Sequence, residues 1–226
     1  MIESKPTRLK YYIILFSIIG ICLLYGCAQL AKPQQINLDS IAEFEGKQVI
    51  VEGRICRHYT TSYGDQFLTI QSINASQSNV TVLVFTEYPI TIEYGDIIQA
   101  TGTVQRYQNE WEITTQTEKD ITLVSKWNNE TYPFWQLAEN PQRYTGLNVK
   151  IKGHIDRVYD TYFYLIDDNE EYCLLVSADY KHQQNVTQGN QVTVCGFFIY
   201  DTENMRYALD ITNDAHGVFL YEEDEA

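Results

Sequence analysis

Residues 46–59 read GKQVIVEGRICRHY, and residues 146–159 read GLNVKIKGHIDRVY. The two stretches match without a gap at seven positions, which are Gly46/Gly146, Val49/Val149, Val51/Ile151, Gly53/Gly153, Ile55/Ile155, Arg57/Arg157 and Tyr59/Tyr159. Chance does not readily produce such a match, so the sequence predicts an internal duplication. A chain of 226 residues has room for two small domains.

Alternating apolar residues predict five β-strands in each copy. The expected strands are 48–55, 66–71, 80–85, 97–107 and 111–124 in the first copy, and 148–155, 162–166, 173–178, 191–200 and 205–211 in the second. A short helical turn is expected before each set, at 36–46 and 133–146. Glycine inside strands one and four of each copy indicates the sharp bends by which a five-stranded sheet closes on itself. The expected fold class is therefore all-β, with two tandem barrels.

Three motifs carry a resemblance to a known family: G-x-x-V-x-V-x-G-x-I, G-D-x-[IV]-x-x-x-G-x-[VF] and the closing K-D-I-T-L-V. With the strand order, they resemble the OB fold, a five-stranded Greek-key barrel, over nearly all of residues 37–221. More narrowly, the pattern is similar to the OB domains of tRNA-anticodon and single-strand-binding proteins, as found in exported archaeal or bacterial proteins. The expected organisation is a signal or anchor at 1–27, a linker at 28–36, a first OB domain at 37–126 and a second at 127–226 with an acidic tail.

The N-terminus has the pattern of an export signal. Lys5, Arg8 and Lys10 precede an uncharged apolar run from Tyr11 to Gly26, and a basic region before such a run is typical of secretory signals. The following Cys27 resembles the lipid-attachment cysteine of lipoproteins, although Tyr25 is bulky for that pattern. An uncleaved helical anchor is the alternative. Both interpretations predict a chain tethered at the extracytoplasmic face of the cell membrane.

Four N-x-[ST] sequences support export weakly. Their asparagines are candidate glycosylation sites and lie in expected loops or linkers: Asn74, Asn79, Asn129 and Asn185.

The expected ligand surface lies where strand one leaves each barrel. Arg57 and Tyr59, with Arg157 and Tyr159, are expected to continue the inward phase of the strand and to reach the edge of the OB cleft. An arginine beside an aromatic residue suits a phosphate and a stacked base. The candidate ligand-binding residues are Arg54, Arg57, Tyr59, Phe67, Tyr107, Trp111, His154, Arg157, Tyr159, Tyr162, Tyr164 and Tyr207. A purely structural role for the repeated arginine and tyrosine is the alternative.

No motif of an enzyme, cofactor or metal site appears in the sequence. The four histidines lack metal-ligand spacing, and the cysteines of the repeats form no C-x-x-C pair. We therefore expect a binding protein without catalytic residues, cofactor or metal.

The ligand class stays open between two interpretations. The family resemblance favours single-stranded nucleic acid. The net charge of −14 favours a cell-surface module that binds another protein or a glycan, since nucleic-acid binding normally rests on lysine and arginine.

Overall fold

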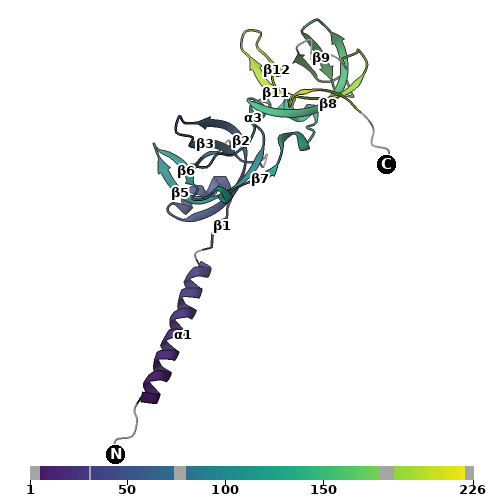
Figure 1. Ribbon diagram of the computed structural model, residues 1–226. Helices are drawn as coiled ribbons and strands as arrows, with labels where there is room; N and C mark the ends of the chain where they lie inside the picture. Colours follow the sequence, from purple (N-terminus) through teal and green to yellow (C-terminus); the bar gives the residue numbers. More distant parts are fainter. Residues whose placement is uncertain (1–5, 31, 74–79, 179–185, 222–226) are drawn as a thin grey trace, which may run out of the picture.

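The chain consists of an N-terminal helix followed by two β-sheets (Figure 1). The computed structural model describes residues 6–30, 32–73, 80–178 and 186–221, without the side chains of residues 6–9 and 27–30. Helix α1 (Pro6–Leu30) points away from the first sheet in Figure 1. Most of its apolar side chains between Tyr11 and Tyr25 are exposed. Among the described residues, no helix has both the length and the hydropathy needed to cross a membrane.

The first sheet closes on itself. Its strands are β1 (Gln34–Gln35), β2 (Gln48–Thr60), β3 (Gln66–Gln71), β4 (Thr81–Thr86), β5 (Ile97–Tyr107), β6 (Glu110–Thr114) and β7 (Ile121–Ser125), in the order β1-β2-β3-β4-β6-β5-β7. An additional pairing of β2 with β5 completes a ring of five strands. The ring encloses a core in which Val49, Ile55, Leu68 and Ile70 are fully buried. The 3₁₀ helices η1 (Leu38–Phe44) and η2 (Glu118–Asp120) flank this ring.

The second sheet repeats the same pairings. Its strands are β8 (Leu147–Val158), β9 (Tyr162–Ile166), β10 (Cys173–Ser177), β11 (Gln191–Asp201), β12 (Arg206–Asp210) and β13 (Gly217–Leu220), in the order β12-β10-β9-β8-β11-β13. The β11–β12 pairing closes this ring. In both sheets the third and fifth ring strands run parallel. The segment between the sheets forms η3 (Trp127–Asn129), α2 (Phe134–Glu139) and α3 (Pro141–Tyr144).

Mostly β structure with a closed five-stranded barrel is consistent with the predicted OB fold. The structure differs from the strand prediction at the ends of the sheets. Residues 121–125 form a separate strand, β7, rather than the end of strand five, and β13 was not expected. Two residues of the expected linker, Gln34 and Gln35, pair with β2 as β1. The expected helical turn at 36–46 is a 3₁₀ helix.

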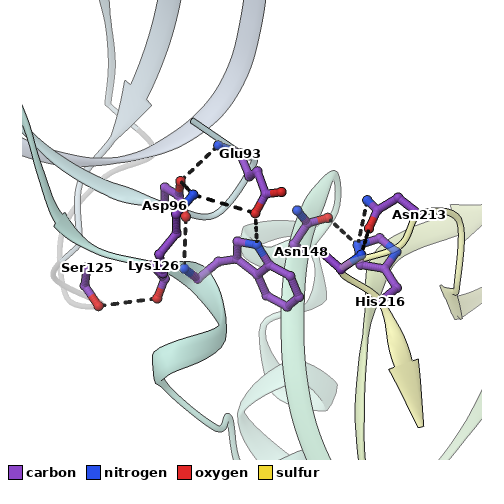
Figure 2. A network of polar contacts seen from close by, with 9 residues as sticks. Glu93, Asp96, Ser125, Lys126, Asn148, Asn213 and His216 are labelled. Atoms are coloured by element: carbon purple, nitrogen blue, oxygen red, sulfur yellow. Dashed lines mark hydrogen bonds and ion pairs between the residues drawn. The ribbon is translucent and has the colours of Figure 1, made fainter. Parts of the chain in front are cut away.

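A fully buried carboxylate, that of Asp96, organises the turn before β5 (Figure 2). Its Oδ2 accepts hydrogen bonds from the backbone N–H of Glu93 at 2.9 Å and from Lys126 Nζ at 3.0 Å. Its Oδ1 accepts one from the backbone N–H of Trp127 at 3.0 Å. The indole Nε1 of Trp127 donates to Glu93 Oε2 at 2.6 Å. These bonds fix the segment leading out of the first sheet against the β4–β5 connection.

Trp127 continues this network into the second sheet. Its ring meets the ring of His216 edge-on, with centroids 5.7 Å apart. His216 Nδ1 accepts the backbone N–H of Thr212 at 3.1 Å, and its Nε2 lies 3.1 Å from Asn148 Oδ1. The backbone N–H of Asn148 donates to Tyr94 O of the first sheet's loop. The two sheets therefore meet through a buried polar network around Trp127 and His216.

Candidate nucleic-acid interface

A β-bulge near the end of strand one sets the geometry of the candidate site. In β2, Ile55 pairs with Ile70 but Arg57 pairs with Thr69, so one residue, Cys56, is inserted between them. A one-residue slip moves every following side chain to the opposite face of a sheet. The prediction that Arg57 continues the inward phase of Ile55 is therefore wrong.

The same bulge occurs in the second sheet. There Ile155 pairs with Leu165 and Val158 pairs with Phe163, which again leaves one extra residue on β8. Because Leu165 and Phe163 point into the core, Arg157 and Tyr159 lie on the outer face. In the OB fold, the outer face of strands two and three, between the loops after strands one and four, is the ligand-binding surface.

The outer face of the second sheet carries a cluster of three tyrosines and one arginine, which we call the tyrosine cluster (Arg157, Tyr159, Tyr162 and Tyr164). The rings of Tyr159 and Tyr162 stack with centroids 4.6 Å apart and planes 20° apart. Tyr164 meets both rings edge-on, at 6.2 and 5.8 Å. The guanidinium of Arg157 lies over Tyr164 at 4.8 Å. Four of the predicted ligand residues thus lie together on one surface.

The matched face of the first sheet is less aromatic. Arg57 and Tyr59 are exposed there, and Tyr59 has 64% of its surface accessible. Tyr59 pairs across the strands with Phe67, whose ring lies 5.0 Å from that of Phe85. Phe85 was not among the predicted residues. Its position opposite Phe67, which only strand pairing reveals, assigns it to this face.

Two of the predicted residues, Trp111 and Tyr207, lie at the ends of the rings rather than on the outer faces. Arg106, on β5, lies 4.4 Å from the ring of Trp111, on β6. At the matched positions of the second sheet, Tyr200 and Tyr207 lie 4.9 Å apart. Both pairs continue the inward-facing side of their strands, but they lie past the last buried core residue. Tyr107, in the last position of β5, is exposed beside the β5–β6 turn.

Arg54 lies in the junction between the sheets. It is 5% exposed, and its guanidinium stacks over Tyr132 at 5.4 Å and lies 4.0 Å from Glu130. Burial is the main reason why the pKa of Tyr132 rises to about 12. His154 lies apart from the tyrosine cluster, with Nε2 3.0 Å from Asp168 Oδ1. Both residues are on the outward phase of strand one but precede the bulge, and they are held by the junction and by Asp168 rather than by the tyrosine cluster.

Among the predicted modification sites, Asn129 is exposed at the end of η3. The side chain of Cys27 and the residues Asn74, Asn79 and Asn185 lie outside the described residues.

The arginine of the tyrosine cluster is partly neutralised. Arg157 Nε donates to Asp156 Oδ2 at 2.8 Å. The aromatic rings therefore contribute more to this surface than net positive charge does, and stacking is the chemistry that the surface supports best.

No protein-family model matches the sequence, and curated proteins give no match. Among solved structures, the chain is similar to a putative aspartyl-tRNA synthetase from Leishmania major (14% identity, TM-score 0.34), of which it covers 21% with 42% of its own length. It is also similar to fission yeast Pot1 with ssDNA (10% identity, TM-score 0.31, 84% of this chain and 88% of that one). A third similar structure is the single-stranded DNA binding protein from Thermus aquaticus (12% identity, TM-score 0.28, 79% of this chain and 94% of that one). At similarities this low, the fold assignment rests on the strand pairings of the chain itself.

Proposed function

We propose that the two sheets form a tandem pair of OB barrels that binds single-stranded nucleic acid on their outer faces. The observation that carries this proposal is the repeated bulge, which turns Arg57 and Tyr59, and Arg157 and Tyr159, outward in both copies. In each copy the exposed tyrosine lies beside an aromatic residue of strand two. Aromatic faces on which bases stack are the main contact of single strands with OB barrels.

Two linked faces support this function better than one. A strand that contacts both faces binds the second at a high effective concentration. The buried network around Trp127 and His216 joins the sheets, so the second face does not have to be brought into position by binding. We propose that the aromatic faces, above all that of the second sheet, make the main contacts with the bound strand.

Binding to a fluorescent oligo-dT strand at low salt, measured by fluorescence anisotropy, tests the proposal. Arg157→Ala removes the cation beside Tyr164 and should weaken binding without lowering the unfolding temperature. Lys119→Ala, which removes an exposed cation in η2, is the matched control and should leave affinity unchanged. Affinity should fall only gently with salt, because few phosphates are neutralised. Absence of oligo-dT binding at high micromolar protein would refute the proposal.

Charge favours a second candidate function, binding of a surface protein or glycan. The chain has 30 acidic and 16 basic residues, and this field repels a polyanion at long range. This candidate would be established if the protein binds a surface protein or glycan through the tyrosine cluster and does not bind oligo-dT.

We also propose that the N-terminal segment tethers the protein outside the cytoplasmic membrane. The basic residues before the apolar run support export, and the exposed apolar surface of α1 needs a lipid cover or removal. Cys27→Ser separates the two kinds of tether: it should abolish lipid labelling and processing of a lipoprotein and leave a helical anchor unchanged. Recovery of the full chain in the cytosol would contradict both.

A further inference from the structure

The outer face of the second sheet contains a cavity of about 350 Å³ next to the tyrosine cluster. Tyr162, which stacks on Tyr159, lines one side of it. Ser177 of β10, Asp210 of β12, and Asp201 and Arg206 at the β11–β12 turn line the rest of its polar surface. A group bound in this cavity would therefore lie beside a base stacked on the tyrosines.

The strand pairings show why the cavity forms in the second sheet. Tyr162 pairs with Ser177, whereas the matched Phe67 pairs with Phe85. The first sheet thus has a phenylalanine ring where the second has a serine hydroxyl. On the fifth ring strand of the second sheet, Ala208 also lines the cavity.

The residue matched to Ala208 is large. It is Glu112, which pairs with Gln105 as Ala208 pairs with Ile199. Glu112 is buried, and its Oε2 accepts a hydrogen bond from Gln105 Nε2 at 2.7 Å. Replacing a phenylalanine and a glutamate by serine and alanine opens the space.

The two carboxylates of the cavity differ in how many further hydrogen bonds they can accept. Asp201 already accepts hydrogen bonds from the Asn204 side chain at 2.7 Å and from the backbone N–H groups of Glu203 and Asn204 at 3.1 Å, so it closes the turn. Asp210 accepts a hydrogen bond from Ser177, and a carboxylate has about four acceptor positions. Asp210 is therefore the acceptor available to a ligand.

Partial burial disfavours the ionised form of Asp210 in the folded state. Desolvation raises the pKa of its carboxyl, and the nearby Asp201 raises it further, against the hydrogen bond from Ser177. The matched residue of the first sheet is the uncharged Thr114. A half-buried carboxylate at a position where the matched strand has a threonine points to a ligand that donates hydrogen bonds.

We infer that this cavity takes the Watson–Crick edge of a guanine base in a bound single strand, with Asp210 accepting both N1–H and the N2 amino group. The inference rests on the proposed nucleic-acid function. Guanine is the base that presents two neighbouring N–H donors, which match the two oxygens of one carboxylate. Thymine offers one donor between two carbonyl oxygens, and a carboxylate repels both of these as it repels phosphate. Tyr162 provides the ring beside which the base lies.

The test compares three labelled strands that are identical except at one central position: oligo-dT, oligo-dT with one guanine, and oligo-dT with one hypoxanthine. Hypoxanthine is guanine without the N2 amino group. The guanine strand should bind at least about fivefold more tightly than the hypoxanthine strand, as expected for the loss of one hydrogen bond to a charged acceptor. Asp210→Asn should remove this difference while oligo-dT affinity stays, because the tyrosine cluster is intact.

Two further variants control for charge and for folding. Glu139→Gln removes an exposed carboxylate at the end of α2 and should keep the guanine preference. Ser177→Phe fills the cavity as Phe85 fills the first sheet and should remove the preference. Its unfolding temperature and its oligo-dT affinity show whether the variant is folded.

The outcomes separate this inference from the proposed function. Equal binding of the guanine and hypoxanthine strands, with oligo-dT still bound, would overturn the guanine site and leave nucleic-acid binding standing. Failure of every strand to bind would overturn both. An arginine-rich peptide that binds through Asp210, with no guanine preference, would assign the cavity to a protein cation instead. A guanine preference that disappears in Asp210→Asn and Ser177→Phe alone would establish the site.

Discussion

The outer faces of the two sheets have the same backbone geometry and differ in the side chains that cover them. Both have the bulge, the outward arginine and the outward tyrosine of strand one. The first face is filled by Phe85 and by the buried Glu112, which accepts a hydrogen bond from the exposed Gln105. At the matched positions, the second face has a serine, an alanine and an isoleucine around a cavity, with stacked tyrosines beside it. The two sheets thus share the residues that set the geometry, and they differ in those that contact the ligand under the proposed function.

The turns before strand four give the largest expected difference between the sheets. Gly95 and Gly189 both have positive φ, at +94° and +86°. A Cβ on Gly189 would meet no atom within 4 Å, whereas on Gly95 it would lie 2.7 Å from the carbonyl oxygen of Asn148. Gly189→Ala should cost about 1–3 kcal/mol of unfolding free energy from backbone strain, and Gly95→Ala clearly more, because it also displaces the second sheet.

Urea unfolding of both glycine variants measures this difference. Equal losses of unfolding free energy would show that the contact between Gly95 and Asn148 adds nothing to the fold. Loss of a single cooperative transition in Gly95→Ala alone would show that this contact couples the sheets.

The aromatic faces give the next difference, in affinity. Tyr159 stacks on Tyr162 at 4.6 Å, so its ring is held in place before a base arrives, whereas Tyr59 is 64% exposed. Tyr159→Ala should weaken oligo-dT binding by about 1–3 kcal/mol, the usual contribution of one stacked base. Tyr59→Ala should weaken it less. Titrations of the two variants under the same salt conditions compare the faces, and a larger loss for Tyr59→Ala would reverse their assigned order.

The sequence predicted the strands of the rings well, because alternation of apolar residues is a local signal. The expected strands at 66–71 and 162–166 coincide with β3 and β9. The faces of Arg57 and Arg157 could not be predicted in the same way. After Ile55 and Ile155 the strand side chains are mostly polar, so nothing in the pattern marks the extra residue of the bulge.

The junction was also beyond local prediction. The burial of Arg54 depends on Glu130 and Tyr132, which lie more than seventy positions away in the sequence. The cavity could not be predicted from the sequence for a related reason. Asp210 and Ser177 become neighbours only through the parallel pairing of β10 and β12, and an isolated aspartate and serine in two strands carry no signal of a site.

The smallest expected effect concerns the two carboxylates of the cavity, whose pKa values shift in opposite directions. Hydrogen bonds, first from the Asn204 side chain, lower the pKa of Asp201. Its ionised form therefore stabilises the fold at neutral pH, and this contribution is lost as the pH falls through the lowered pKa. Asp201→Asn should reduce the unfolding free energy at pH 7, and the deficit should shrink toward pH 3.

Asp210→Asn should show the opposite sign. Desolvation raises the pKa of Asp210, so its ionised form destabilises the folded state above that pKa, and the penalty disappears as the pH falls and the carboxyl is protonated. The variant should be slightly more stable than the natural chain at pH 7 and equal to it near pH 3. The effect is small, because solvent screens a half-exposed charge and because the nearby Asp201 is itself paired with Arg206, at 3.8 Å. Urea unfolding between pH 3 and pH 7 measures it. A loss of stability at pH 7 in Asp210→Asn would mean that the fold needs this carboxylate, and the argument that it is kept for a ligand would fail.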